Sequence, residues 1–323
     1  MDHQRTEFYP FYDPYRGGNM LSMTAKASLS LSVGLIYILL LFLSIPDKMA
    51  FFEQSFWILG AVMSTCIMAL YAATMSFRKS LDTIDRIEGK MGISQHVVGD
   101  WLKDNNFLLA GAGFATLNTT IGHLLGVPSA LHESVASLSL FYVGFFMAGF
   151  LAGMGLLAIA AVIVMHLRFA PYLQHALDPE NPDGSGGIGA LGDSLWFYAL
   201  LIGLVGVLVA IFLVNVKWTF MYKTYVQLIY LFWLALPFVL AVSVVLIPGL
   251  AVRRQVSQYK VYRERQLKNE QAQLYSSYKE FDAAEDDEII ASKKELNQKM
   301  NDIETKMNKL RKMRTSHIDG KES

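Results

Sequence analysis

The sequence predicts an all-α membrane protein with six transmembrane helices and a cytoplasmic C-terminal coiled coil or helical hairpin. Hydrophobic residues make up 53% of the 323 residues and charged residues only 17%, against about a quarter in soluble domains. Of the 56 Asp, Glu, Lys and Arg residues, 29 lie in 251–323. The preceding part of the chain is poor in charge and contains apolar stretches near the roughly 20 residues that a membrane-crossing helix needs.

The same composition excludes several classes of protein. A formal net charge of zero provides no basic field for nucleic acid, so no nucleic-acid partner is expected. The single cysteine, Cys66, allows neither an intrachain disulfide nor a cysteine-based metal site. No nucleophile elbow, zinc-binding helix or P-loop pattern is present. We therefore expect no metal, no cofactor and no enzymatic activity.

Six segments form the predicted membrane domain over 27–250, after a polar and aromatic lead over 1–26. The third segment is only mildly apolar, so a re-entrant or core-buried helix is the alternative for it. The first segment lacks an A-x-A-like cleavage site, and we expect it to be retained in the protein. The predicted spans are about 27–45, 55–77, 107–126, 135–165, 195–216 and 225–250.

The distribution of Lys and Arg predicts that both termini are cytoplasmic. Five basic residues lie in the connection 78–106 and five more in 251–265, whereas the connection 127–134 has none. An even number of crossings places both termini on the basic side, which agrees with this distribution. Trp218 and Trp196 are expected at the two membrane boundaries, where aromatic side chains concentrate.

Segment 78–106 is predicted to contain an amphipathic cytoplasmic helix. Leu81, Ile84, Ile87 and Met91 recur at helical spacing, and a basic amphipathic helix commonly lies among lipid headgroups. Two interpretations stay open, an interfacial gating or coupling element and a helix that packs under the bundle.

The loop 166–194 is acidic and rich in glycine. Clustered carboxylates suit a hard cation such as Ca²⁺, and glycine N–H groups ahead of a helix suit an anion. The alternative is a tight re-entry loop in which Asp193 caps the fifth helix. A dinucleotide site is excluded because no strand precedes the glycines. The candidate ion or anion loop consists of Asp178, Glu180, Asp183, Gly186, Gly187 and Asp193.

One stretch of this loop resembles a known pattern. Residues 182–192 read P-D-G-S-G-G-I-G-A-L-G, which is similar to the H-P-D-x-x-G-G-L-x-x-L-G stretch of poorly characterised prokaryotic polytopic membrane proteins. Asn181 stands where that pattern has His, and Ile188 where it has Leu. The resemblance covers about a dozen residues. It implies a prokaryotic source, and hence the inner cell membrane, but no activity.

A few polar side chains interrupt the predicted spans. They either hydrogen-bond to neighbouring helices, at about 1 kcal/mol each, or line a water path. No Asp or Glu falls inside any predicted span, which disfavours ion-driven transport and leaves a passive pathway open. The candidate pore-lining or interhelical residues are Ser64, Thr65, Asn118, Thr119, Thr120, His123 and Gln227.

Two further features concern how the spans pack. Gly149 and Gly153 are four residues apart on the fourth span, so another helix can approach closely, within one subunit or between subunits. Pro237 in the sixth span lacks a backbone N–H and is predicted to kink the helix and act as a hinge.

The tail over 251–323 has coiled-coil spacing. Leu267, Leu274 and Phe281 form a first run, and an acidic stretch separates it from a second run in a different register. That break fits either one long helix or the turn of a helical hairpin. The predicted core of the second run is Ile289, Leu296, Met300, Ile303, Met307 and Leu310.

Three functional hypotheses follow. We favour a homo-oligomeric channel or pore-like protein in the lipid bilayer, with passive conduction and a coiled-coil assembly tail. The second hypothesis is a non-conducting scaffold or sensor whose cytoplasmic tail recruits a protein partner. The third is a membrane enzyme acting at the loop 166–194, but no known catalytic spacing links His166, His175, Asp178 and Asp183.

Overall fold

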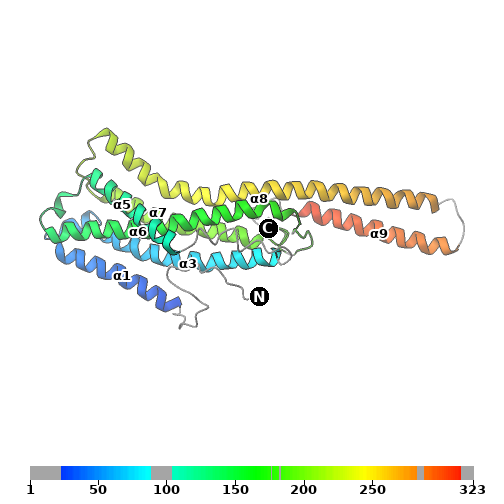
Figure 1. The fold of residues 1–323 in the computed structure, drawn as a ribbon, viewed down its shortest axis with the longest axis horizontal. Coiled ribbons are helices and arrows are strands. Elements are labelled where there is room, and N and C mark those ends of the chain that lie inside the picture. Colours follow the sequence, from blue (N-terminus) through cyan, green and yellow to red (C-terminus); the bar gives the residue numbers. More distant parts are fainter. Residues whose placement is uncertain (1–22, 89–103, 176, 182, 282–286, 314–323) are drawn as a thin grey trace. The chain divides into compact units, whose positions relative to one another are not determined.

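The computed structural model of the chain describes residues 23–88, 104–175, 177–181, 183–281 and 287–313. All regular structure in these ranges is helical (Figure 1). Six helices are long and apolar enough to cross a membrane: α1 (Met23–Ser44), α3 (Trp57–Glu88), α5 (Asp104–Leu125), α6 (Val135–Phe169), α7 (Gly189–Asn215) and α8 (Thr224–Phe281). The other helices are α2 (Lys48–Glu53), η1 (Ser129–Leu131), η2 (Ala170–His175) and α9 (Asp287–Lys312). The prediction of six apolar helices, including the mildly apolar third, is confirmed.

The helices extend beyond the predicted spans at several ends. α3 continues to Glu88, so the first part of segment 78–106 is an extension of a membrane helix, while 89–103 lies outside the described residues. α7 begins at Gly189, six residues before the predicted start at 195. The predicted start was set by the length of the apolar segment alone. The residues that precede this segment also belong to α7, and among them Leu191 is fully buried in the protein.

The chain divides into two compact units. The membrane unit comprises residues 1–165 and 194–246, and the hairpin unit comprises 166–193 and 247–323. The continuous helices α6, α7 and α8 each contribute residues to both units.

The three connections that are poor in Lys and Arg meet at one end of the membrane unit. Thr219 N, between α7 and α8, donates a hydrogen bond to Gly126 O, between α5 and α6, at 3.2 Å. Lys217 N donates to the Gln54 side chain, between α1 and α3, at 3.3 Å. The grouping of these connections agrees with an up-and-down arrangement of six crossings.

Trp218 lies in the core of this end of the membrane unit. Its side chain is only 6% exposed, and its ring centroid lies 5.9 to 6.3 Å from those of Phe141, Phe145 and Phe212. The indole Nε1 donates to Leu213 O at 2.9 Å. Trp218 therefore packs among aromatic rings with its N–H satisfied, and its position at a membrane boundary stays a prediction.

The hairpin unit is built on α9, which runs back along the distal part of α8 (Figure 1). The Lys293 ammonium lies 6.0 Å from the ring centroid of Tyr278. Arg311 lies 3.7 Å from Glu264. Residues near the start of α9 thus contact the end of α8, and residues near the end of α9 contact an earlier part of α8, as in an antiparallel pair. Of the two alternatives for the tail, the described residues form the helical hairpin.

Thiol labelling tests the number of crossings. Six crossings place exposed residues 129 and 222 on one face of the membrane and exposed residue 276 on the other. We expect Ser129→Cys and Tyr222→Cys to react with an impermeant maleimide from one face only, and Ser276→Cys from the opposite face only. Native Cys66 is buried and gives a low background. Labelling of Ser129→Cys and Ser276→Cys from the same face would contradict six crossings.

Candidate functional site

The loop between η2 and α7 is organised around the carboxylate of Asp183. This carboxylate accepts hydrogen bonds from the N–H groups of Ser185 at 2.7 Å, Gly187 at 3.0 Å and Gly189 at 2.9 Å. Gly186 and Gly187 have φ of +73° and +92°, a conformation that favours glycine. With these positive φ values the N–H groups of alternate residues point inward, so the loop wraps around its own anion.

This geometry bears on the predicted ion or anion site. The N–H group of Gly187, which the sequence offers to an external anion, donates to Asp183. Asp178 accepts from Glu180 N at 2.9 Å and so also takes part in a local turn. Among the described residues, no three His, Cys, Asp or Glu side chains lie close enough to hold a metal ion. Ion or anion binding by this loop stays a prediction.

Asp193 does not cap α7. The helix begins at Gly189, which places Asp193 a full turn inside it. Asp183 instead accepts the N–H of Gly189 and brings a negative charge to the helix N-terminus, where the helix dipole favours it.

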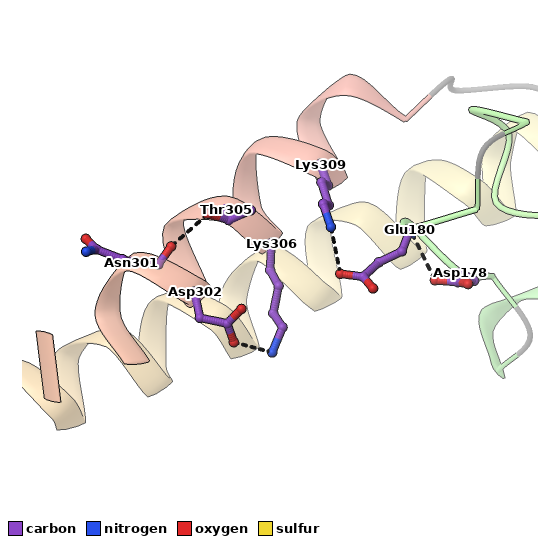
Figure 2. A network of polar contacts seen from close by, with 7 residues as sticks. All are labelled: Asp178, Glu180, Asn301, Asp302, Thr305, Lys306 and Lys309. Carbon is purple, nitrogen blue, oxygen red and sulfur yellow. Dashed lines mark hydrogen bonds and ion pairs between the residues drawn. The ribbon is translucent and has the colours of Figure 1, made fainter. Parts of the chain in front are cut away.

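Polar contacts join this loop to the hairpin. The Tyr259 hydroxyl on α8 donates to Leu177 O at 3.0 Å, and burial raises the pKa of Tyr259. The phenol therefore keeps its proton, and can donate, at neutral pH. Lys309 Nζ on α9 lies 3.1 Å from Glu180 Oε1, as Figure 2 shows. Because both side chains are about half exposed, this ion pair orients the loop more than it stabilises it.

Apolar contacts reinforce the same junction. Gly186 packs so closely on Leu177 and Met313 that a Cβ at Gly186 would lie 2.9 Å from Leu177 Cδ2 and 3.4 Å from Met313 Sδ. Leu177 and Met313 are 7% and 4% exposed. Lys260 Nζ also donates to Met313 O and ties the end of the hairpin. The loop and both hairpin helices thus form one packed module.

The apolar seam of the tail is filled inside the chain. Leu267 on α8 packs with Ile303, Met307 and Leu310 on α9, and all four side chains are 8% exposed or less. Leu296 and Met300 are half-buried. Ile289 lies in α9, but its side chain is outside the described residues.

Asn118 joins three helices of the membrane unit. Its Nδ2 donates to Phe145 O on α6 at 2.7 Å, and its Oδ1 accepts from Trp233 Nε1 on α8 at 3.2 Å. Trp233 also stacks on Phe114, with ring centroids 5.3 Å apart. At 9% exposure, the Asn118 amide connects α5, α6 and α8 in the interior.

Ser64 has a similar interhelical position. Its hydroxyl donates to Ser30 O on α1 at 2.9 Å, and Thr65 beside it is half-buried. Nearby, Gly34 and Gly60 allow α1 and α3 to approach, since a Cβ at Gly60 would lie 2.7 Å from Gly34 O.

The remaining polar candidates do not converge on one path. Thr119 and Thr120 donate to carbonyls of their own helix, each at 2.8 Å. His123 Nδ1 lies 2.9 Å from the Tyr142 hydroxyl, and Gln227 donates to Met221 O at 2.9 Å. Thr120, His123 and Gln227 are exposed on the membrane unit, so the structure separates them from buried Asn118.

The two predicted packing glycines face α5. A Cβ at Gly149 would lie 2.8 Å from the Cβ of Asn118, and one at Gly153 would lie 2.7 Å from the Cβ of Phe114. The close approach is therefore within one chain. Pro237 lies in the unbroken helix α8, with its Cβ 2.8 Å from the position of a Cβ on Gly206 of α7. Its role as a hinge stays a prediction.

Sequence reasoning missed that the sixth helix continues as a buried stripe beyond its predicted span and contacts the loop at Tyr259. Val252 and Val256, each 1% exposed, lie on the same face of α8 as Tyr259. This helical stripe, continuing past the predicted end of the sixth span, was the available signal. No family model, curated protein or solved structure matches this chain.

Substitution of Asp183 tests the loop. Asp183→Asn keeps the shape but replaces a doubly accepting carboxylate with a single acceptor oxygen. We expect a loss of about 1–3 kcal/mol in local stability, measured as faster amide hydrogen exchange at Ser185, Gly187 and Gly189. Asp178→Asn is the matched control, because Asp178 accepts one exposed N–H. Unchanged exchange in Asp183→Asn would show that the loop does not depend on this carboxylate.

A glycine pair tests the helix contact in the membrane unit. Gly149→Leu should overpack the α5–α6 interface and cost about 1–3 kcal/mol, seen as a lower melting temperature in detergent. Gly113→Leu is the control, because a Cβ at Gly113 meets nothing within 4 Å. Equal melting temperatures for the two variants would mean that α5 and α6 do not pack as described.

Proposed function

We propose that this chain is a membrane-embedded scaffold or sensor whose hairpin unit recruits a cytoplasmic protein partner. The docking of the loop 177–189 onto both hairpin helices, through Tyr259, Lys309 and Met313, carries this proposal. A flexible tether would not need such contacts, whereas a recognition module needs a fixed surface.

The filling of the apolar seam supports this function over a channel with a coiled-coil stalk. A parallel stalk requires Ile303, Met307 and Leu310 to face other subunits. These residues pack on α8 of the same chain, so assembly through this seam would first have to separate the hairpin.

A basic face of α8 is the surface that we assign to the partner. Arg253, Arg254 and Arg265 are exposed along it, and they flank Val261 and Tyr262, whose exposed fractions are 51% and 63%. An aromatic anchor surrounded by guanidinium groups suits an acidic segment that also carries an apolar side chain.

The connectivity supports a sensing role. The docked loop follows α6 and precedes α7, and the basic face lies on α8. These are the three helices that contribute residues to both units. A partner that displaces α9 from α8 would change the contacts of Glu180 and Leu177, and hence the loop from which α7 begins.

Photo-crosslinking in cells tests this function. A photoreactive amino acid at Tyr262 should give one discrete protein adduct, and Arg254→Glu with Arg265→Glu should reduce it at least about tenfold, because like charges oppose an acidic partner. Lys279→Glu with Lys294→Glu is the control, since both lysines are exposed elsewhere on the hairpin. Absence of an adduct, or equal loss in the control, would contradict the proposal.

A homo-oligomeric passive channel is the second candidate, and one observation favours it. Thr116, Thr120 and His123 form an exposed polar stripe on α5, and although each has one hydrogen-bond partner in the chain, such a stripe is better covered by another helix or by water than by lipid. In planar bilayers this function requires a conductance that Thr120→Val alters. Absence of current from folded protein would leave the scaffold or sensor function.

A further inference from the structure

The membrane unit contains a long, partly open apolar cavity that neither candidate function uses. Its volume is about 250 Å³, and α3, α5, α6, α7 and α8 contribute most of its lining. On α3 the lining runs from Leu59 to Phe77, and on α6 from Phe145 to Val162. At ~1.5 Å per residue these stretches are about 25 Å long. A small volume spread over such a length fits one extended hydrocarbon chain.

The polarity of the lining differs between the two ends. Near one end lies Asn118, whose amide oxygen and nitrogen already bond to Trp233 and Phe145, so that end favours hydrocarbon. Near the other end lie Thr74 and Lys26, and the ammonium of Lys26 is 5.4 Å from the ring centroid of Tyr71. An ammonium near the membrane boundary attracts an anionic headgroup.

We propose that this cavity binds a single-chain lipid with an anionic headgroup. The hydrocarbon chain lies between α3, α6 and α7 and ends near Asn118, and the headgroup lies at Lys26. The carboxylate of a free fatty acid and the phosphate of a lysophospholipid share this chemistry. The proposal is independent of the partner-binding face on α8.

Cys66 provides a native probe of the cavity. It is the single cysteine of the sequence, it is 5% exposed, and it lines the cavity between the two ends. In the purified full chain, a bound lipid should slow the reaction of Cys66 with an apolar maleimide. Native mass spectrometry of the same samples counts bound lipid and serves as a second readout, with one equivalent expected.

The lipids tested are palmitate, palmitoyl lysophosphatidate and hexadecanol. We expect saturable protection of Cys66, and one bound equivalent, with at least one of the two anions. Binding of palmitate alone would assign a fatty acid, and binding of lysophosphatidate alone a lysophospholipid. Lys26→Gln should weaken anion binding about tenfold, which equals about 1.4 kcal/mol. Hexadecanol binding as tightly as both anions would overturn the headgroup assignment.

Two glycine variants test the location of the chain. Gly155 lines the cavity, and a Cβ there meets nothing within 4 Å, so Gly155→Leu should fill the space without a backbone clash and reduce binding at least tenfold. Gly203→Leu is the control, because a Cβ at Gly203 also meets nothing and this glycine is not part of the lining. Unchanged binding in Gly155→Leu, or no binding to the parent chain by either readout, would overturn the proposal.

Arg254→Glu with Arg265→Glu separates the two proposals. This variant should bind the lipid normally, because both substitutions lie on the partner-binding face. Loss of its crosslink together with normal lipid binding would support both proposals. Loss of lipid binding in this variant would contradict the independence of the cavity.

Discussion

The hydrocarbon interior of the membrane constrains this structure most strongly, because polar groups there must find their partners within the protein. Thr119 and Thr120 donate to carbonyls of their own helix. Asn118 joins α5, α6 and α8 through its side-chain amide, and Ser64 joins α1 to α3. Polar side chains that resemble a pore lining in the sequence thus have their hydrogen-bond partners on their own helix or on a neighbouring helix of the same chain. Because these polar groups bond within the protein, few of them remain to line a conduction path through a single chain.

The same requirement organises the hairpin unit by different chemistry. The loop after η2 turns several N–H groups toward one point. Such a cluster of donors needs an acceptor, which can be either a bound anion or a side chain of the loop. Asp183 supplies the acceptor from within the loop, as an external anion would in a binding site. An internal carboxylate is always present, so the shape of the loop does not depend on ligand concentration. That permanence makes the loop a suitable base for the contacts with Tyr259 and Lys309.

Sequence rules predicted the elements better than their contacts. Apolar length located all six helices that are long and apolar enough to cross a membrane, and the acidic break after Phe281 allowed the hairpin. Helical spacing shows which residues share a face, but not which helix meets that face. Asn118 and Thr120 therefore looked equivalent, although one is buried and the other exposed. Asp183, and not Asp193, is the carboxylate at the N-terminus of α7. This depends on how the glycine-rich loop folds, which residue type alone does not specify.

The filled hairpin seam also changes where self-association must arise. A homo-oligomer could instead form through the membrane unit, where Thr116, Thr120 and His123 make an exposed polar stripe on α5. Gly149 and Gly153 cannot provide such a contact, because they already face α5 within the chain. Weak interhelical hydrogen bonds, at about 1 kcal/mol each, would make such an assembly sensitive to protein density in the membrane. The α5 stripe and the basic face of α8 share no residues, so an oligomer and a recruiting scaffold are compatible in one protein.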